Sequence, residues 1–228
     1  MNSQTRRDIR FGLISLALSG LLMTLAAVVR GPMSGLTGEF LLRDAASPNW
    51  GPAWAIGVVG SVLQVYGFLG LYRYLTYRAE NRLAFLAAVL SATAMALFIG
   101  PASFIAFYSP VVGNLYLQGN EAMIAVWNAR LASTLGSALF GVMGVGYIFG
   151  PILFAVAIWR DGRLPKWTGI FLALSSALTA YPVFFPAEVL GMVLLLISSS
   201  VMAWKGWRES APEAASSASQ EGVLNAVS

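Results

Sequence analysis

Uncharged and mostly apolar residues fall into six long runs along this chain, and charged residues stand at both ends of every run. A helix that crosses the hydrocarbon core of a bilayer needs about 20 consecutive apolar residues, and the six runs contain between 16 and 38 residues. The pattern therefore predicts an all-α fold, a polytopic transmembrane bundle of six helices. We expect these helices at about residues 11–29, 52–75, 83–108, 131–158, 167–185 and 187–205.

The six spans and the segments that connect them predict one transmembrane domain over residues 1–209. A short helix is expected near residues 36–42. Residues 110–120 contain two glycines, two asparagines and a glutamine, so we expect a loop at the membrane surface there. Residues 121–130 are expected to form an interfacial helix or to extend the fourth span. The tail from 210 to 228 is rich in Ser, Ala and Glu, which is typical of disorder.

The basic residues predict the orientation of the bundle. Eleven of the 14 Lys and Arg residues lie on the side that would hold both termini, and only Arg30, Arg43 and Arg130 lie on the other. Because cytoplasmic segments of membrane proteins carry an excess of Lys and Arg, both termini are expected to be cytoplasmic. The expected location is the inner or plasma membrane of a cell, as a multi-pass protein.

Composition supports a membrane protein and excludes several kinds of function. Hydrophobic residues make up 57% of the chain and charged residues only 11%, against about 25% charged in ordinary soluble proteins. We therefore expect neither a soluble enzyme nor a nucleic-acid partner. The expected partner is the lipid bilayer. The chain contains no Cys and no His, which removes disulfides, thiolate nucleophiles and the usual zinc and haem ligands. We expect no cofactor and no metal site.

Glycines on the fourth expected helix indicate close helix packing. Gly146 and Gly150 are four residues apart, a spacing that lets two helix backbones approach in lipid, and Gly141 precedes them. Packing inside the bundle is the simpler interpretation. The alternative is packing against a second copy of the chain or another membrane protein.

Candidate ligand-binding residues gather mainly at the outer end. No Asp, Glu, Lys or Arg lies deep inside an expected span, which weighs against proton pumping. Gln64 is the one amide well inside a span. At the outer end, an aromatic belt with surface salt bridges is the simpler interpretation. The alternative is an outward-opening cavity with Arg130 and Glu188 as its charged elements. The further candidates there are Glu121, Asn128 and Trp54.

One string supports a family resemblance. Residues 160–169 read Arg-Asp-Gly-Arg-Leu-Pro-Lys-Trp-Thr-Gly. This string resembles a cytoplasmic hairpin of the form R-x-G-x-L-P-x-W-x-G in uncharacterised bacterial six-helix membrane proteins, which are classed as domains of unknown function. Residues 70–75 are similar to the same group. The resemblance implies a six-helix bacterial inner-membrane protein and implies no site.

Three functions remain open from the sequence. The first is non-catalytic binding of a lipid, a small apolar ligand or a membrane partner, which glycine-rich packing and the absence of buried charge favour. The second is a small transporter or permease subunit with a water-accessible cavity near Gln64 or Arg130. The third is an enzyme acting on a lipid-like substrate through Glu121 or Glu188, which requires these carboxylates to converge. The sequence favours a protein that is not an enzyme.

Reporter fusions test the orientation. Fusions after Arg78 and after Arg163 should report a cytoplasmic location, and a fusion after Asn114 should report an external one. The reason is the bias of basic residues. An external location at Arg163 would overturn the prediction of six crossings.

Overall fold

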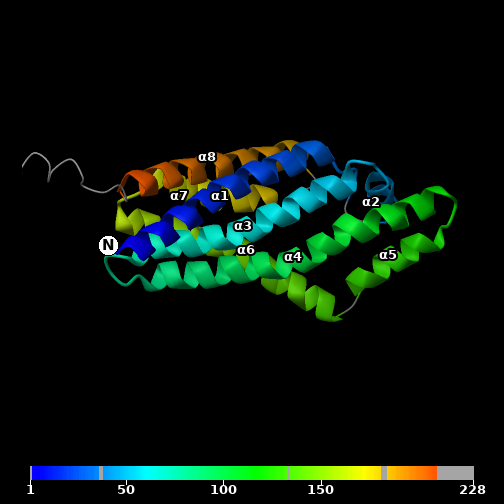
Figure 1. Ribbon diagram of the computed structural model, residues 1–228. Coiled ribbons are helices and arrows are strands. Elements are labelled where there is room, and N and C mark those ends of the chain that lie inside the picture. The colour runs from blue at the N-terminus through cyan, green and yellow to red at the C-terminus, as the bar shows by residue number, and fades with distance from the viewer. Residues whose placement is uncertain (1, 36–37, 133, 181–183, 210–228) are drawn as a thin grey trace, which may run out of the picture.

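The computed structural model describes residues 2–35, 38–132, 134–180 and 184–209, with the side chains of 130–132 and 135 also outside the description. The expected disordered tail lies outside the described residues. Within them the chain is all-α (Figure 1). The helices are α1 (Ser3–Arg30), α2 (Gly38–Ala45), α3 (Trp50–Thr76), α4 (Arg82–Leu117), α5 (Ala122–Ala132), α6 (Thr134–Asp161), α7 (Lys166–Thr179) and α8 (Phe185–Glu209).

Six of these helices form a closed ring. Going round the ring, α1 packs against α3, α3 against α4, α4 against α6, α6 against α7, α7 against α8, and α8 returns to α1. We call the end of the ring where α1 finishes and α8 begins the outer end, and the opposite end the inner end. The start of α1 and the end of α8 both lie near the inner end (Figure 1). The two helices run antiparallel, and the Arg10 guanidinium stacks on the Trp207 ring there.

Within the described part of the chain, five helices are long and apolar enough to cross a membrane: α1, α3, α4, α6 and α8. The chain is therefore a multi-pass membrane protein in contact with lipid. The fifth expected span, at about residues 167–185, differs from these five, because α7 has only 14 residues and is about 21 Å long at 1.5 Å per residue. It ends three residues before Pro182 in the sequence, and a proline disfavours helical backbone in the residue before it.

The loop expected at residues 110–120 is wrong for residues 110–117, because α4 continues through Pro110 to Leu117, and only residues 118–120 form a turn. Contact with α2 supports this extension. Gly113 is buried, and a Cβ atom there would lie 2.8 Å from the backbone nitrogen of Ala46. Polar and glycine residues thus stay helical because another helix packs on them. The helix expected near residues 36–42 is present as α2, and α5 is a separate helix before α6.

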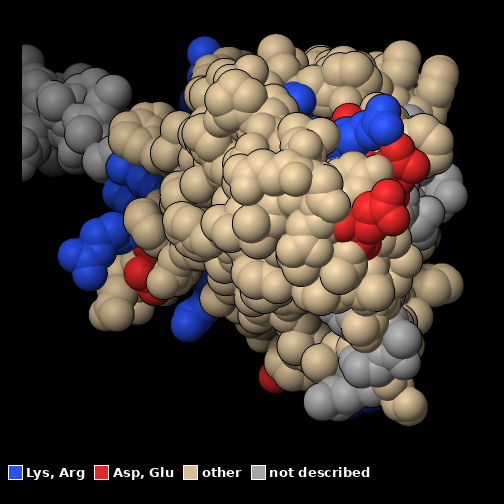
Figure 2. Space-filling model, turned by 90° about the vertical axis from the view of Figure 1, so that its right-hand side faces the viewer, with Lys and Arg blue, Asp and Glu red and all other residues tan. Residues whose placement is uncertain are grey.

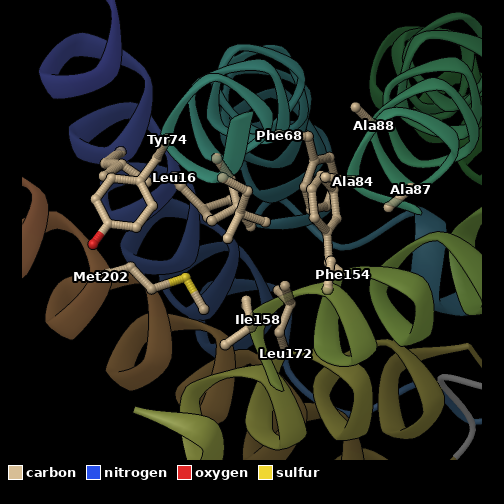
Figure 3. Packing of buried hydrophobic residues seen from close by; sticks show 14 of the residues in the cluster. Leu16, Phe68, Tyr74, Ala84, Ala87, Ala88, Phe154, Ile158, Leu172 and Met202 are labelled. Atoms are coloured by element: carbon tan, nitrogen blue, oxygen red, sulfur yellow. The ribbon is translucent and has the colours of Figure 1, made fainter. Parts of the chain in front are cut away.

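Buried hydrophobic residues of the described chain form two clusters. The inner cluster lies between the ring helices in the inner half, where Phe68 stacks on Phe154 with ring centroids 5.6 Å apart (Figure 3). The outer cluster joins α2, the tip of α4 and α5, which form a cap beyond the end of α1 (Figure 1). Its buried members are Met33, Leu41, Leu42, Ala45, Trp50, Val112 and Trp127.

The turn between α6 and α7 is hydrogen-bonded to α3 and α8 at the inner end. Gly162 has φ +73°, a conformation that favours glycine, and it starts the turn that leads into α7. The next residue, Arg163, pairs with Asp161 at 2.8 Å and donates to the backbone oxygen of Tyr74 in α3 at 2.8 Å. Lys205 of α8 donates to the Arg163 oxygen at 2.7 Å. One arginine thus links three parts of the ring.

Glycine contacts bring α1 and α3 together most closely. A Cβ atom on Gly12 would overlap the Cα atom of Gly70 and lie 2.9 Å from the backbone oxygen of Tyr66. On α6, a Cβ atom on Gly146 would lie 2.7 Å from the backbone oxygen of Leu90, whereas one on Gly141 would meet nothing within 4 Å. Gly146 therefore packs inside the bundle, and Gly141 faces open space.

These contacts give a paired test. Gly12→Ala should lower the free energy of unfolding by about 1 to 3 kcal/mol, because the added methyl group forces two backbones apart. The control is Gly141→Ala, which should leave stability unchanged or raise it by up to about 1 kcal/mol through helix propensity. Unfolding in detergent micelles measures both. Equal effects of the two substitutions would contradict the close contact.

Candidate functional site

A cavity of about 460 Å³ lies in the outer half of the ring. All six ring helices contribute to its wall, and most of the wall is apolar. Small residues line much of it, including Ala27, Ala53, Gly57 and Gly144. The other lining residues are Met23, Ala26, Arg30, Trp54, Met95, Phe98, Ile105, Phe140, Met143, Tyr147, Ile148, Thr179, Ala180, Glu188 and Met192.

A buried ion pair forms the charged part of this cavity. The Arg30 guanidinium donates to the Glu188 carboxylate at 2.5 Å, and the two side chains are only 7% and 5% exposed. Arg30 is the last residue of α1, and Glu188 lies in the first turn of α8. A positive charge suits the C-terminus of a helix and a negative charge the N-terminus. Each charge is therefore balanced by its partner and by its own helix.

Trp54 gives the cavity an aromatic wall with a polar atom. Its ring packs between Trp50 and Phe98, with centroid distances of 6.0 and 6.3 Å. Its indole nitrogen is buried and has no hydrogen-bond partner within the described part of the chain. A buried N–H group without a partner is costly. A ligand that accepts a hydrogen bond would remove that cost.

A second, smaller void of about 20 Å³ adjoins the floor of the cavity. Four residues line both spaces: Met23, Tyr147, Thr179 and Met192. Apolar residues and one glycine line part of this void, and neutral polar residues line the rest. The polar residues are Gln64, Ser91, Tyr147, Ser175, Ser176 and Thr179. A void of this size has room for about one water-sized group.

The hydrogen bonds around this void are directional. The Thr179 hydroxyl donates to the backbone oxygen of Ser175 at 2.7 Å. Because a hydroxyl has one proton, Tyr147 must be the donor in its 2.5 Å bond with Thr179. The hydroxyls of Ser175 and Ser176 donate to backbone oxygens of their own helix. The hydroxyl oxygens of Tyr147, Ser175 and Ser176 therefore keep lone pairs for accepting a further hydrogen bond.

Three of the six candidate ligand-binding residues lie at these spaces. Glu188 and Trp54 line the large cavity, and Gln64, which is buried, lines the small void. Glu121 and Asn128 are exposed on the cap and line neither space. The side chain of Arg130 lies outside the described residues.

Figure 2 views the outer end and shows acidic and basic atoms side by side on a mostly uncharged surface. The exposed pair of Arg43 and Glu39 on α2 belongs to that surface. Within the described residues no group of three acidic side chains could hold a metal ion.

The glycines of α6 lie in two different environments. Gly146 and Gly150 pack on α4, and a Cβ atom on Gly150 would overlap the Ser91 hydroxyl oxygen. Gly150 thus leaves room for that hydroxyl beside the void. Gly141 does not contribute to packing within the described chain.

Sequence reasoning missed Arg30, Tyr147 and Thr179 as a connected site. One signal was present for Arg30. It closes the first run, and Glu188 opens the last one. If the first and last helices are antiparallel neighbours, these two charges lie at one level. The sequence does not indicate which helices are neighbours, so it does not favour Arg30 over Arg130 as the basic element.

No family model matches the sequence, and no curated protein or solved structure matches it.

The buried ion pair predicts a double-mutant result. Arg30→Leu or Glu188→Leu alone should lower the free energy of unfolding by about 3 to 5 kcal/mol, because each leaves one buried charge unpaired. The double substitution should recover most of that loss. Denaturation in detergent micelles measures the cycle. Additive losses in the double variant would show that the charges do not act as a pair.

Proposed function

We propose that this protein binds a small apolar or lipid-like molecule in the outer-half cavity without catalysing a reaction on it. The cavity itself is the observation that supports the proposal. Ligand sites typically have volumes of about 300 to 1,000 Å³ with mainly apolar walls and a few polar groups. The 460 Å³ space with Trp54 and the ion pair fits that description.

The arrangement of the carboxylates favours binding over catalysis. Glu188 is engaged by Arg30, and Glu121 is exposed on the cap. General acid–base chemistry by two carboxylates needs both within reach of one substrate. A transporter is the second alternative and needs a path to the inner end. The inner cluster occupies that path with large side chains, including Phe68 and Phe154.

The same proposal includes a membrane placement. We infer six passages through a bacterial inner membrane, with α7 in the fifth, and both termini in the cytoplasm. The bias of Lys and Arg toward the inner end supports this orientation. The resemblance of residues 160–169 to uncharacterised bacterial six-helix proteins supports the choice of membrane.

Photochemical labelling tests binding in the cavity. The probe is a 12-carbon hydrocarbon with a diazirine at mid-chain, added to the protein in phospholipid nanodiscs. Met95 lines the cavity and is only 2% exposed, whereas Phe149 is 54% exposed on α6. Labelling at Met95 should therefore saturate with probe, and labelling at Phe149 should rise with the probe content of the lipid.

Two glycines on α6 provide the variant and its control. Gly144 lines the cavity with open space beside it, and Gly141 faces open space without lining the cavity. Gly144→Phe should reduce Met95 labelling about tenfold, which corresponds to about 1.4 kcal/mol of binding free energy, because the added side chain occupies part of the cavity. Gly141→Phe should not change it. Unsaturable labelling at Met95 in the unmodified protein would rule out a binding cavity.

A further inference from the structure

We propose that the small polar void is a subsite for a neutral hydroxyl group, so that the ligand is a single-chain alcohol lying with its hydroxyl toward the centre of the bundle. This inference rests on the proposed function, because the chain of the alcohol would occupy the large cavity. The four residues that line both spaces place the void directly at the cavity floor.

An unpartnered buried hydroxyl marks the subsite. Ser91 lines the void, is 1% exposed, and its hydroxyl oxygen has no hydrogen-bond partner among the described residues. Serines in helices commonly donate to a carbonyl of the preceding turn, as Ser175 and Ser176 do. Ser91 does not, so its proton has no acceptor among the described residues. Leaving such a buried group unpaired costs free energy.

The neighbouring groups complete the recognition of a hydroxyl. Tyr147, Ser175 and Ser176 use their protons elsewhere and offer only lone pairs to the void. Ser91 offers a proton. A hydroxyl group both donates and accepts, and therefore matches this mixture. An alkyl end satisfies none of these groups, and an ionised carboxylate only accepts.

The charge of the site favours a neutral head group. All six polar residues around the void are neutral. An isolated ion in a dry interior pays a large desolvation penalty unless it is paired. The positive charge of the large cavity, on Arg30, is already paired with Glu188. An alcohol carries no such penalty.

Two methionines stand between the large cavity and the void. Met23 of α1 and Met192 of α8 line both spaces. Methionine side chains are unbranched and flexible, so they adapt to ligands of different shape. Glycines also make room at the void. A Cβ atom on Gly191 would lie 2.7 Å from the Thr179 methyl carbon.

Competition against the diazirine hydrocarbon tests the subsite. The competitors are 1-dodecanol, dodecane and ionised dodecanoate, each at the same mole fraction in the nanodisc lipid. 1-Dodecanol should prevent Met95 labelling at an about fivefold lower mole fraction than dodecane, which corresponds to one net hydrogen bond. Dodecanoate should compete no better than dodecane.

Two serines of α4 provide the variant and a matched control. Ser91 and Ser109 are both buried, and neither hydroxyl has a partner among the described residues, but only Ser91 lines the void. Ser91→Ala should abolish the preference for 1-dodecanol over dodecane, and Ser109→Ala should keep it. Tyr147→Phe should also weaken the preference, because it removes an acceptor.

Each of the other outcomes would contradict either the hydroxyl subsite or the binding cavity. Equal competition by 1-dodecanol and dodecane would show that the void holds only water, and would leave the proposed cavity intact. Stronger competition by dodecanoate would place an anionic head at Arg30 and overturn the hydroxyl subsite. Loss of the preference in Ser109→Ala would assign it to a general effect on α4. Absence of competition by all three would overturn the proposed function itself.

Discussion

Glycine backbone contacts close the ring of helices, and the remaining structure depends on them. In lipid, burying apolar side chains between helices gains little, because the lipid tails are equally apolar. Association then depends on close packing, which residues without side chains permit. Each of the six interfaces of the ring contains a glycine whose Cβ atom would lie within 3.1 Å of the neighbouring helix. These glycines are Gly12 with Gly70, Gly20, Gly51, Gly146 with Gly150, Gly169 and Gly191.

A closed ring of six helices creates a central space that side chains must fill. In the inner half the filling residues are large, and Phe68 and Phe154 stack across the centre (Figure 3). In the outer half the residues facing the centre are often Ala or Gly, as at Ala27, Ala53 and Gly57. The helices there are held apart by the same ring, so a cavity remains. The size of the central residues thus determines which half binds a ligand.

The fold was predictable to the extent that charges mark the ends of helices. The run between Arg10 and Arg30 predicts α1, and the run between Asp44 and Arg73 predicts α3, because an apolar run of that length leaves few other structures in lipid. The spacing of charges does not predict where a helix continues beyond the apolar run. Pro110 and Gly113 suggest a loop by local propensity, yet contact with α2 keeps α4 helical. Such contacts depend on tertiary structure and leave no local pattern.

The site was predictable only in part, for a related reason. Glu188, Trp54 and Gln64 stand out in the sequence because polar or amphipathic groups are rare in apolar runs. Their partners do not stand out. Tyr147 and Thr179 look like ordinary helix residues, and their meeting follows from the order of helices round the ring. A list of helices does not contain that order, since several rings can be drawn from the same six segments.

The paired charges of Arg30 and Glu188 at the outer end also favour a neutral ligand. A buried ion pair contributes little to stability compared with apolar residues of the same size, because desolvation offsets the attraction. The pair of Arg30 and Glu188 is therefore poorly explained as a fastening between α1 and α8, which Gly20 already brings into contact. Its chemical effect on the cavity is clearer. It supplies a local dipole with no net charge, so that the outer end attracts neither anions nor cations strongly. A neutral molecule can then pass the pair and reach the neutral hydroxyls at the floor without leaving any charge uncompensated.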